Sequence, residues 1–229
     1  MSRTIVITGA TGGIGAALVR AAAERGYEVL AAARDSVRLS ALCDRVPGAG
    51  PLVLDLRDPT DPPASLRALD RLDAVVHCAG IAEVATVEAT SYALWLETLT
   101  INVAAAAEVT RALLPALRAA EGHVVFVNAA PGLHAVPQWS AYTASKAALR
   151  ELADSLRKEE AGYGVRVTTV YPGGTATDLL RDVRSAFGDS FDPDRCIQPE
   201  TLASLVMTVL DMRGDAYVPE LAVLPTPGG

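Results

Sequence analysis

Short apolar runs alternate along almost the whole chain with longer segments in which apolar residues recur at helical spacing. The short runs are rich in Val, Ile, Leu and Ala, as expected of strands that are covered on both faces. The alternation is typical of repeated strand-helix-strand units, and it predicts an α/β fold with a parallel sheet. Seven strands are expected, at residues 4–8, 28–33, 51–54, 74–78, 122–128, 166–171 and 217–223.

Helices are expected between these strands. Their starts and ends follow from N-cap residues such as Ser36, from Gly26 as a terminator, and from Pro199 at a first turn. The expected helices cover residues 13–25, 36–45, about 92–114, 140 to about 160, and 199–210.

The segment 175–198 is the least regular part of the chain, because its periodicity is weak and it contains Gly188, Pro193 and several charges. It is either a solvated connection or a mobile lid over a site. No change of composition marks a second domain, so residues 1–229 are expected to form one domain with a loose tail at about 225–229.

Composition narrows the classes of partner. Half of the residues are hydrophobic, and 20 basic against 27 acidic side chains give a net charge of −7. This acidic balance argues against general binding of nucleic acid or of an anionic membrane. No apolar run approaches the ~20 residues needed to span a bilayer, and the first residues do not resemble an export signal. We therefore expect a cytoplasmic protein.

Cysteine and histidine placement argues against a structural metal. The three cysteines lie far apart and form no C-x-x-C pair, which argues against a disulfide framework and a structural zinc site and fits a reducing compartment. The three histidines, at positions 77, 123 and 134, contain no i, i+4 pair. No metal site is predicted.

A glycine-rich turn follows the first expected strand and opens the first expected helix. Glycines at 9, 13 and 15 would let a diphosphate approach the backbone at the helix N-terminus. The spacing G-x-x-x-G-x-G differs from the G-x-G-x-x-G fingerprint, so an ordinary glycine turn remains the alternative. In context, the turn indicates a dinucleotide cradle.

The end of the second strand is where a dinucleotide fold selects its cofactor. Arg34 there favours the 2′-phosphate of NADP, whereas the adjacent Asp35 would favour the ribose hydroxyls of NAD if it were the residue turned to the cofactor. Both could instead be solvated charges. The register of the strand against the fingerprint favours NADP(H) over NAD(H).

Tyr142 and Lys146 are four residues apart and share one face of an expected helix. An ammonium beside a phenol stabilises the phenolate and brings its pKa toward the working range of a general acid or base. Lys146 is also one of only two lysines in the chain. A surface Tyr and Lys on a solvated helix is the alternative meaning of such a short motif.

Taken together, these motifs resemble the short-chain dehydrogenase/reductase family over residues 4 to about 225. Asp55-Leu56 falls where that family contacts adenine, residues 77–80 (His-Cys-Ala-Gly) resemble its Asn-Asn-Ala-Gly turn, and Asn102 resembles its catalytic helix asparagine. The turn at 172–177 after the sixth strand also matches.

The resemblance implies a doubly wound Rossmann-type fold, seven strands in the order 3-2-1-4-5-6-7, and a nicotinamide-dependent oxidoreductase acting on a small-molecule carbonyl or alcohol. It implies that Tyr142 passes a proton to or from the substrate oxygen, that Lys146 holds the ribose and tunes Tyr142, and that Asn102 fixes a water. A homodimer or homotetramer is expected by the same likeness. The implied cofactor contacts are Gly9, Thr11, Gly13, Ile14, Gly15, Arg34, Asp55, Leu56, Ala79, Gly80, Tyr142, Lys146, Pro172, Gly173, Thr175 and Thr177.

One departure from the family pattern concerns catalysis. The family's catalytic serine stands thirteen residues before the tyrosine, and here that position is Ala129. Another side chain could replace the serine, with Asn128, His134 and Ser140 as candidates, although each has a plain structural role as an alternative: a strand-end cap, loop surface and a helix N-cap. Among these, His134 is the favoured substrate contact, alongside Ala129 itself.

Two function classes remain open. The leading one is an NADP(H)-dependent reductase, working either with a substitute donor or slowly through Tyr142 alone. The other is a catalytically impaired or inactive cofactor-binding or regulatory protein with the same fold, which Ala129 keeps open. Retention of Tyr142, Lys146 and Asn102 together favours an enzyme. Cys78 is expected to be a buried small residue and not a nucleophile.

Overall fold

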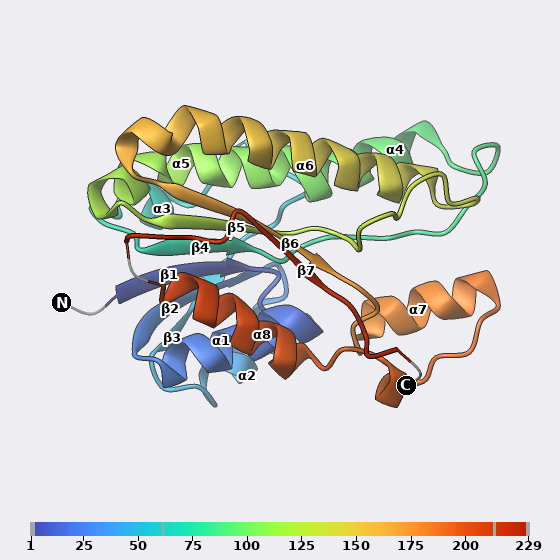
Figure 1. Ribbon diagram of the computed structural model, residues 1–229, viewed down its shortest axis with the longest axis horizontal. Helices are drawn as coiled ribbons and strands as arrows, with labels where there is room; N and C mark the ends of the chain where they lie inside the picture. The colour runs from blue at the N-terminus through green and yellow to red at the C-terminus, as the bar shows by residue number, and fades with distance from the viewer. Residues whose placement is uncertain (1–2, 61, 213, 228–229) are drawn as a thin grey trace.

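The computed structural model describes residues 3–60, 62–212 and 214–227. It contains a seven-stranded sheet in the order β3-β2-β1-β4-β5-β6-β7, and every pair of neighbouring strands is parallel (Figure 1). The predicted Rossmann-type fold and strand order are confirmed. The strands are β1 (Arg3–Thr8), β2 (Tyr27–Ala33), β3 (Ala49–Val53), β4 (Ala74–His77), β5 (His123–Val127), β6 (Arg166–Pro172) and β7 (Glu220–Val223).

Helices cover both faces of the sheet, as Figure 1 shows. One face carries α1 (Gly13–Glu24), α2 (Ser36–Cys43) and α8 (Pro199–Leu210), and the other carries α3 (Ala64–Arg67), α5 (Ala105–Ala120) and α6 (Ser140–Glu160). Within the described ranges, no helix is long and apolar enough to cross a membrane.

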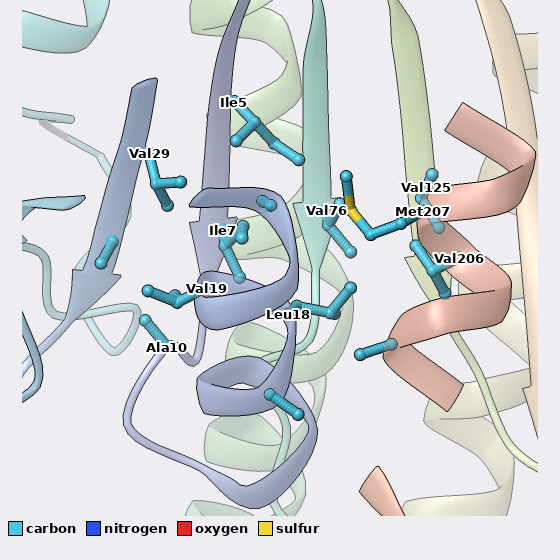
Figure 2. Close-up of a cluster of buried hydrophobic side chains, with 14 of the residues drawn as sticks. Ile5, Ile7, Ala10, Leu18, Val19, Val29, Val76, Val125, Val206 and Met207 are labelled. Carbon is cyan, nitrogen blue, oxygen red and sulfur yellow. The ribbon is translucent and has the colours of Figure 1, made fainter. Parts of the chain in front are cut away.

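Alternation along the strands divides the apolar side chains between two cores. Ile5 and Ile7 of β1 point to the α1 and α8 side, while Val6 between them points to the α5 and α6 side, and all three are fully buried. Figure 2 shows the first core, in which Leu18 of α1 and Met207 of α8 pack on the central strands. Such two-sided burial explains why the strands read as continuous apolar runs in the sequence.

The long helix expected at 92–114 is three segments in the structure. It begins as α4 (Tyr92–Leu99), passes through a π-helical turn, η1 (Thr100–Ala104), and continues as α5 to Ala120. The expected end of this helix at about residue 114, before Pro115, is wrong. Pro115 lies on the exposed side of α5, where water can hydrogen-bond the carbonyl that the ring leaves without a partner.

The two serines expected as N-caps do not have that role. Asp35 caps α2, since its carboxylate accepts hydrogen bonds from the backbone amides of Val37 and Arg38 at 3.1 and 3.0 Å. Trp139 occupies the N-cap position of α6, and Ser140 is the first helical residue.

The segment 175–198, expected to be irregular, contains helix α7 (Asp178–Phe187) and a short 3₁₀ turn, η3 (Pro193–Arg195). The Thr177 hydroxyl accepts a hydrogen bond from the amide of Leu180 and caps α7, and Gly188 ends the helix at φ +76°. Figure 1 shows α7 beyond the carboxyl ends of the strands.

The chain end contributes the edge strand β7. The amide of Gly173 donates a hydrogen bond to the carbonyl of Val223 at 2.7 Å, and a Cβ atom at Gly173 would lie 2.7 Å from Cδ of Pro225. The expected loose tail at 225–229 is therefore packed at its first residue. Residues 228–229 lie outside the described ranges.

Candidate active site

A cleft of about 370 Å³ runs along the carboxyl ends of β1, β2 and β4. It collects the predicted contacts for a dinucleotide from five separate stretches of sequence. These are Gly9, Thr11, Gly13, Ile14, Gly15, Arg34, Asp55, Leu56, Ala79, Gly80 and Thr177. Ligands bind at this position in open α/β sheets because the carboxyl ends of parallel strands meet there.

The glycine turn fits a diphosphate. Gly9 has φ +66°, and a Cβ atom there would lie 2.8 Å from Ala79, so no other residue suits the position. Gly12 is the N-cap of α1 and offers no side-chain cap, and no acidic residue occupies the first helical turn. The amides of the first turn and the helix dipole therefore suit the binding of an anion at the end of α1 that faces the cleft.

Arg34 and Asp35 have different environments. Arg34 lines the cleft, and so does Arg38, whose guanidinium donates to the carbonyl of Thr11 at 3.1 Å. The carboxylate of Asp35 is turned to the backbone of α2, where it serves as the N-cap. The part of the cleft at the end of β2 thus presents two guanidinium groups.

A second cavity, of about 430 Å³, adjoins this cleft and shares Ile14, Cys78 and Thr177 with it. It contains the predicted catalytic pair and the turn after β6. The predicted residues on its wall include Gly80, Ala129, Tyr142, Lys146, Pro172, Gly173 and Thr175. We call it the catalytic cavity.

Helix α6 places Tyr142 and Lys146 side by side, with Nζ of Lys146 5.8 Å from the centre of the Tyr142 ring. Nζ donates a hydrogen bond to the carbonyl of Val127 at 3.0 Å. Burial raises the pKa of Tyr142 to about 12 and lowers the pKa of Lys146 to about 8. The expected lowering of the phenol pKa is therefore not found, because loss of solvent outweighs the ammonium in this apolar wall.

Asn102 lies in the π-helical turn η1 and is 2% exposed. Its side chain accepts from the amide of Ile81 at 2.9 Å and donates to the carbonyl of Ile81 at 3.0 Å and to the hydroxyl of Ser145 at 2.9 Å. A Cβ atom on Gly80 would lie 3.3 Å from Oδ1 of Asn102 and 3.8 Å from Nζ of Lys146. Asn102 thus holds the loop after β4 against α6, next to Lys146.

Ala129 lies on the wall beside Tyr142, and none of the three candidate substitutes supplies a donor there. Asn128 is tied to the backbone: its side-chain amide donates to the carbonyl of Lys146 at 3.1 Å, and its side-chain oxygen accepts from the backbone amide of Ala129 at 2.9 Å. His134 and Ser140 line a neighbouring cavity that shares Asn128 and Ala129 with the catalytic cavity, and neither is among the residues that line the cavity of Tyr142.

The turn that departs from the family's two asparagines is built differently. The ring of His77 stacks on Phe126 at 4.9 Å and bonds the Thr110 hydroxyl at 2.9 Å, so it faces the core. Cys78 faces the two cavities, and burial raises the pKa of its thiol to about 12, which fits the expected inert small residue.

Sequence reasoning missed two aromatic residues of the catalytic cavity. The ring of Trp139 stacks on that of Tyr142 with centroids 4.4 Å apart, and it meets Phe187 edge-on at 5.7 Å. Phe187 could have been found, since Leu180, Val183 and Phe187 recur at helical spacing between the cap residues Thr177 and Gly188.

Comparison with known proteins identifies the family. The model of the short chain dehydrogenases matches residues 3–187. An uncharacterised short-chain type dehydrogenase/reductase of Sinorhizobium fredii is 32% identical over 96% of this chain and 90% of its own length. The chain belongs to the short-chain dehydrogenase/reductase family of oxidoreductases.

Solved structures of the same family have a similar fold. An oxidoreductase of this family from Burkholderia thailandensis is 32% identical and superposes with a TM-score of 0.85, covering 100% of this chain and 92% of that one. A metagenomic short-chain oxidoreductase in complex with NADP is 27% identical, with a TM-score of 0.81 over 98% of this chain and 97% of that one.

Proposed function

We propose that this protein is an NADP(H)-dependent carbonyl reductase in which Tyr142 is the proton donor. The observation that carries the proposal is the placement of Tyr142 and Lys146 on the wall of the catalytic cavity, which adjoins the cleft that contains the glycine turn. When bound, a reduced nicotinamide supplies a hydride to the carbonyl carbon. The protein positions the substrate and supplies the proton.

Tyr142 donates its hydroxyl proton to the carbonyl oxygen. With a pKa raised to about 12, the phenol is fully protonated at neutral pH, which favours reduction over alcohol oxidation. The ammonium of Lys146, whose pKa lies at about 8, still carries its charge at pH 7 and stabilises the phenolate that proton donation leaves behind.

NADP(H) is favoured by the two guanidinium groups in the part of the cleft at the end of β2. Arg34 and Arg38 suit the dianionic 2′-phosphate. Asp35 would select NAD(H) only with a free carboxylate, and its carboxylate caps α2. The presence of NADP in the metagenomic relative is in line with this preference.

The test is NADPH oxidation over a panel of aldehydes and ketones, with Tyr142→Phe and an NADH arm as controls. We expect turnover with NADPH that falls at least a thousandfold in Tyr142→Phe. NADPH binding without any turnover by the wild type, and with turnover appearing in Ala129→Ser, would instead establish a cofactor-binding protein that has lost its chemistry.

A further inference from the structure

The wall of the catalytic cavity is apolar on three sides. Ala82 follows β4, Ala129 and Leu133 lie in the loop after β5, and Val183 and Phe187 come from α7. Together with Trp139 and the ring of Tyr142 they form one hydrophobic cluster. A ligand that enters beside Tyr142 is therefore surrounded by hydrocarbon.

Thr175, Thr177, Asn128 and Lys146, which are polar residues of this wall, have hydrogen-bond partners within the protein, whereas Nε1 of Trp139 is buried and has none among the described residues. Thr175 donates to the carbonyl of Gly173 at 3.1 Å, and Thr177 donates to the carbonyl of Thr175 at 3.3 Å. Asn128 and Lys146 are engaged by the backbone bonds described above. In the described part of the chain, no hydrogen bond engages the hydroxyl of Tyr142, which leaves it free for a substrate oxygen.

The only full charges on the wall besides Lys146, among the described residues, are those of Arg184 and Asp189. They face each other at 3.7 Å and are 47% and 59% exposed. They therefore form a mutually neutralised, solvated pair at the mouth of the cavity. Deeper inside, the ammonium of Lys146 is the one charge among the described lining residues, and it lies behind the reacting group, 5.8 Å from the centre of the Tyr142 ring and bonded to the carbonyl of Val127. A charge on the hydrocarbon part of a substrate would face the apolar wall instead, where burying it would be costly.

Phe187 closes the hydrophobic part of the cavity. It is the last residue of α7, and its ring meets Trp139 edge-on while Trp139 lies flat on Tyr142. The three rings connect α7 to the catalytic helix, so the substrate's hydrocarbon portion lies against aromatic surface next to the reacting carbonyl.

Building on the proposed function, we infer that the substrates are uncharged, hydrophobic carbonyl compounds of aryl or alicyclic type. Their one recognised polar atom is the carbonyl oxygen that meets Tyr142, and Phe187 is a specificity-determining residue. Ala129, which stands at the position of the family serine, is part of the same apolar wall, since it presents a methyl group and not a hydroxyl on the side that faces the substrate.

The first test uses two ketones of equal shape, 4′-methylacetophenone and 4-acetylbenzoate, which differ by a methyl group or a carboxylate at one position. We expect kcat/KM with NADPH to be at least about a hundredfold higher for the methyl compound. Calorimetric titration of each ketone into the enzyme with NADP⁺ measures binding without turnover, and only the methyl compound should bind measurably.

The second test compares Phe187→Ala with Tyr92→Ala. Tyr92 is an aromatic residue of α4 that is 78% exposed and lies outside the catalytic cavity. Phe187→Ala should lower kcat/KM for 4′-methylacetophenone about tenfold and leave that for propanal within twofold. Tyr92→Ala should change neither, and thermal unfolding confirms that both variants fold.

The outcomes separate this inference from the proposed function. Equal or tighter binding of 4-acetylbenzoate, no binding of either ketone, or an equal loss for both substrates in Phe187→Ala would overturn the substrate class. Selective binding of the methyl compound without NADPH consumption would support the apolar specificity and overturn the proposed reduction.

Discussion

The side-chain amide of Asn102 donates a hydrogen bond of 2.9 Å to the hydroxyl of Ser145, and the same hydroxyl donates to the carbonyl of Tyr142 at 2.7 Å. The π-helical turn η1 is thereby tied to the helix turn that carries the proposed proton donor. π-Helical turns often occur at functional sites, and here the turn sets Asn102 against the loop after β4.

Asn102→Ala removes three hydrogen bonds and leaves buried partners unsatisfied. We expect a loss of about 1–3 kcal/mol in the free energy of unfolding and a lower kcat, because the loop at Gly80 and the position of Lys146 lose their support. Urea unfolding and steady-state kinetics measure both. Ser145→Ala removes one of the three bonds and should have the smaller effect; the reverse order would contradict this account.

Ala129→Ser restores a hydroxyl on the wall next to Tyr142. A single oxyanion donor is typically worth about 10²–10³ in turnover. We expect a smaller rise in kcat for ketone reduction, of at least about tenfold, because the surrounding residues are not adapted to position a serine hydroxyl at this site. Ala129→Gly changes the same position without adding a donor and should give no gain. An unchanged rate in Ala129→Ser would show that Tyr142 alone suffices.

Arg34→Ala should discriminate between cofactors. Loss of one charge-assisted hydrogen bond costs about 1.5–3 kcal/mol, which predicts a tenfold or larger fall in kcat/KM for NADPH and little change for NADH. Asp35→Ala should leave the ratio of the two cofactors unchanged and destabilise the fold by about 1 kcal/mol, since it removes the cap of α2. A larger change of the ratio in Asp35→Ala than in Arg34→Ala would reverse the assignment.

Lys146 should set the alkaline limit of the reaction. Burial lowers its pKa to about 8, so the ammonium loses its proton as pH rises through that value and the phenolate of Tyr142 loses its counter-charge. We expect kcat/KM for reduction to fall above about pH 8. In Lys146→Arg the charge persists and the rate, although lower, should stay level to pH 9.5. A wild-type profile without an alkaline limb would exclude this role.

His77 and His123 should make the fold acid-sensitive. Burial lowers the pKa of each ring to about 3, whereas an unfolded histidine titrates near 6.5. Between these values the unfolded state binds more protons, so stability falls as pH drops, by up to about 1.4 kcal/mol per pH unit for each histidine. Urea unfolding at pH 7.5 and 5 measures the loss, and the variant with both residues replaced by Asn should lose less.

The strand pattern could be predicted because both faces of the sheet are covered. Ile5, Val6 and Ile7 are all buried, so the centre of β1 is an uninterrupted apolar run of the kind that predicts a covered strand. Helix ends were less certain, because a single residue decides them. Pro115 continues α5 only because its face is exposed, and exposure is a property of the fold and not of the local sequence.

Some features of the candidate site could likewise be predicted from the sequence, and others depend on the fold. Local spacing was enough to bring Tyr142 and Lys146 together, and the order of motifs was enough to place Gly9 and Thr177 on one cleft. The raised pKa of Tyr142 could not be predicted, because it depends on burial by α7 and by the loop after β5. The exclusion of His134 from the catalytic cavity likewise depends on the path of that loop.

The edge strand β7 has a consequence for biosynthesis. The turn at Gly173, which faces the catalytic cavity, is held by Val223 and Pro225, more than forty residues later in the chain. A ribosome makes β7 after the other six strands, and a domain generally folds as a unit. The nascent chain therefore cannot complete the Gly173 turn until β7 has been made, and a premature stop before residue 219 would remove the support of that turn.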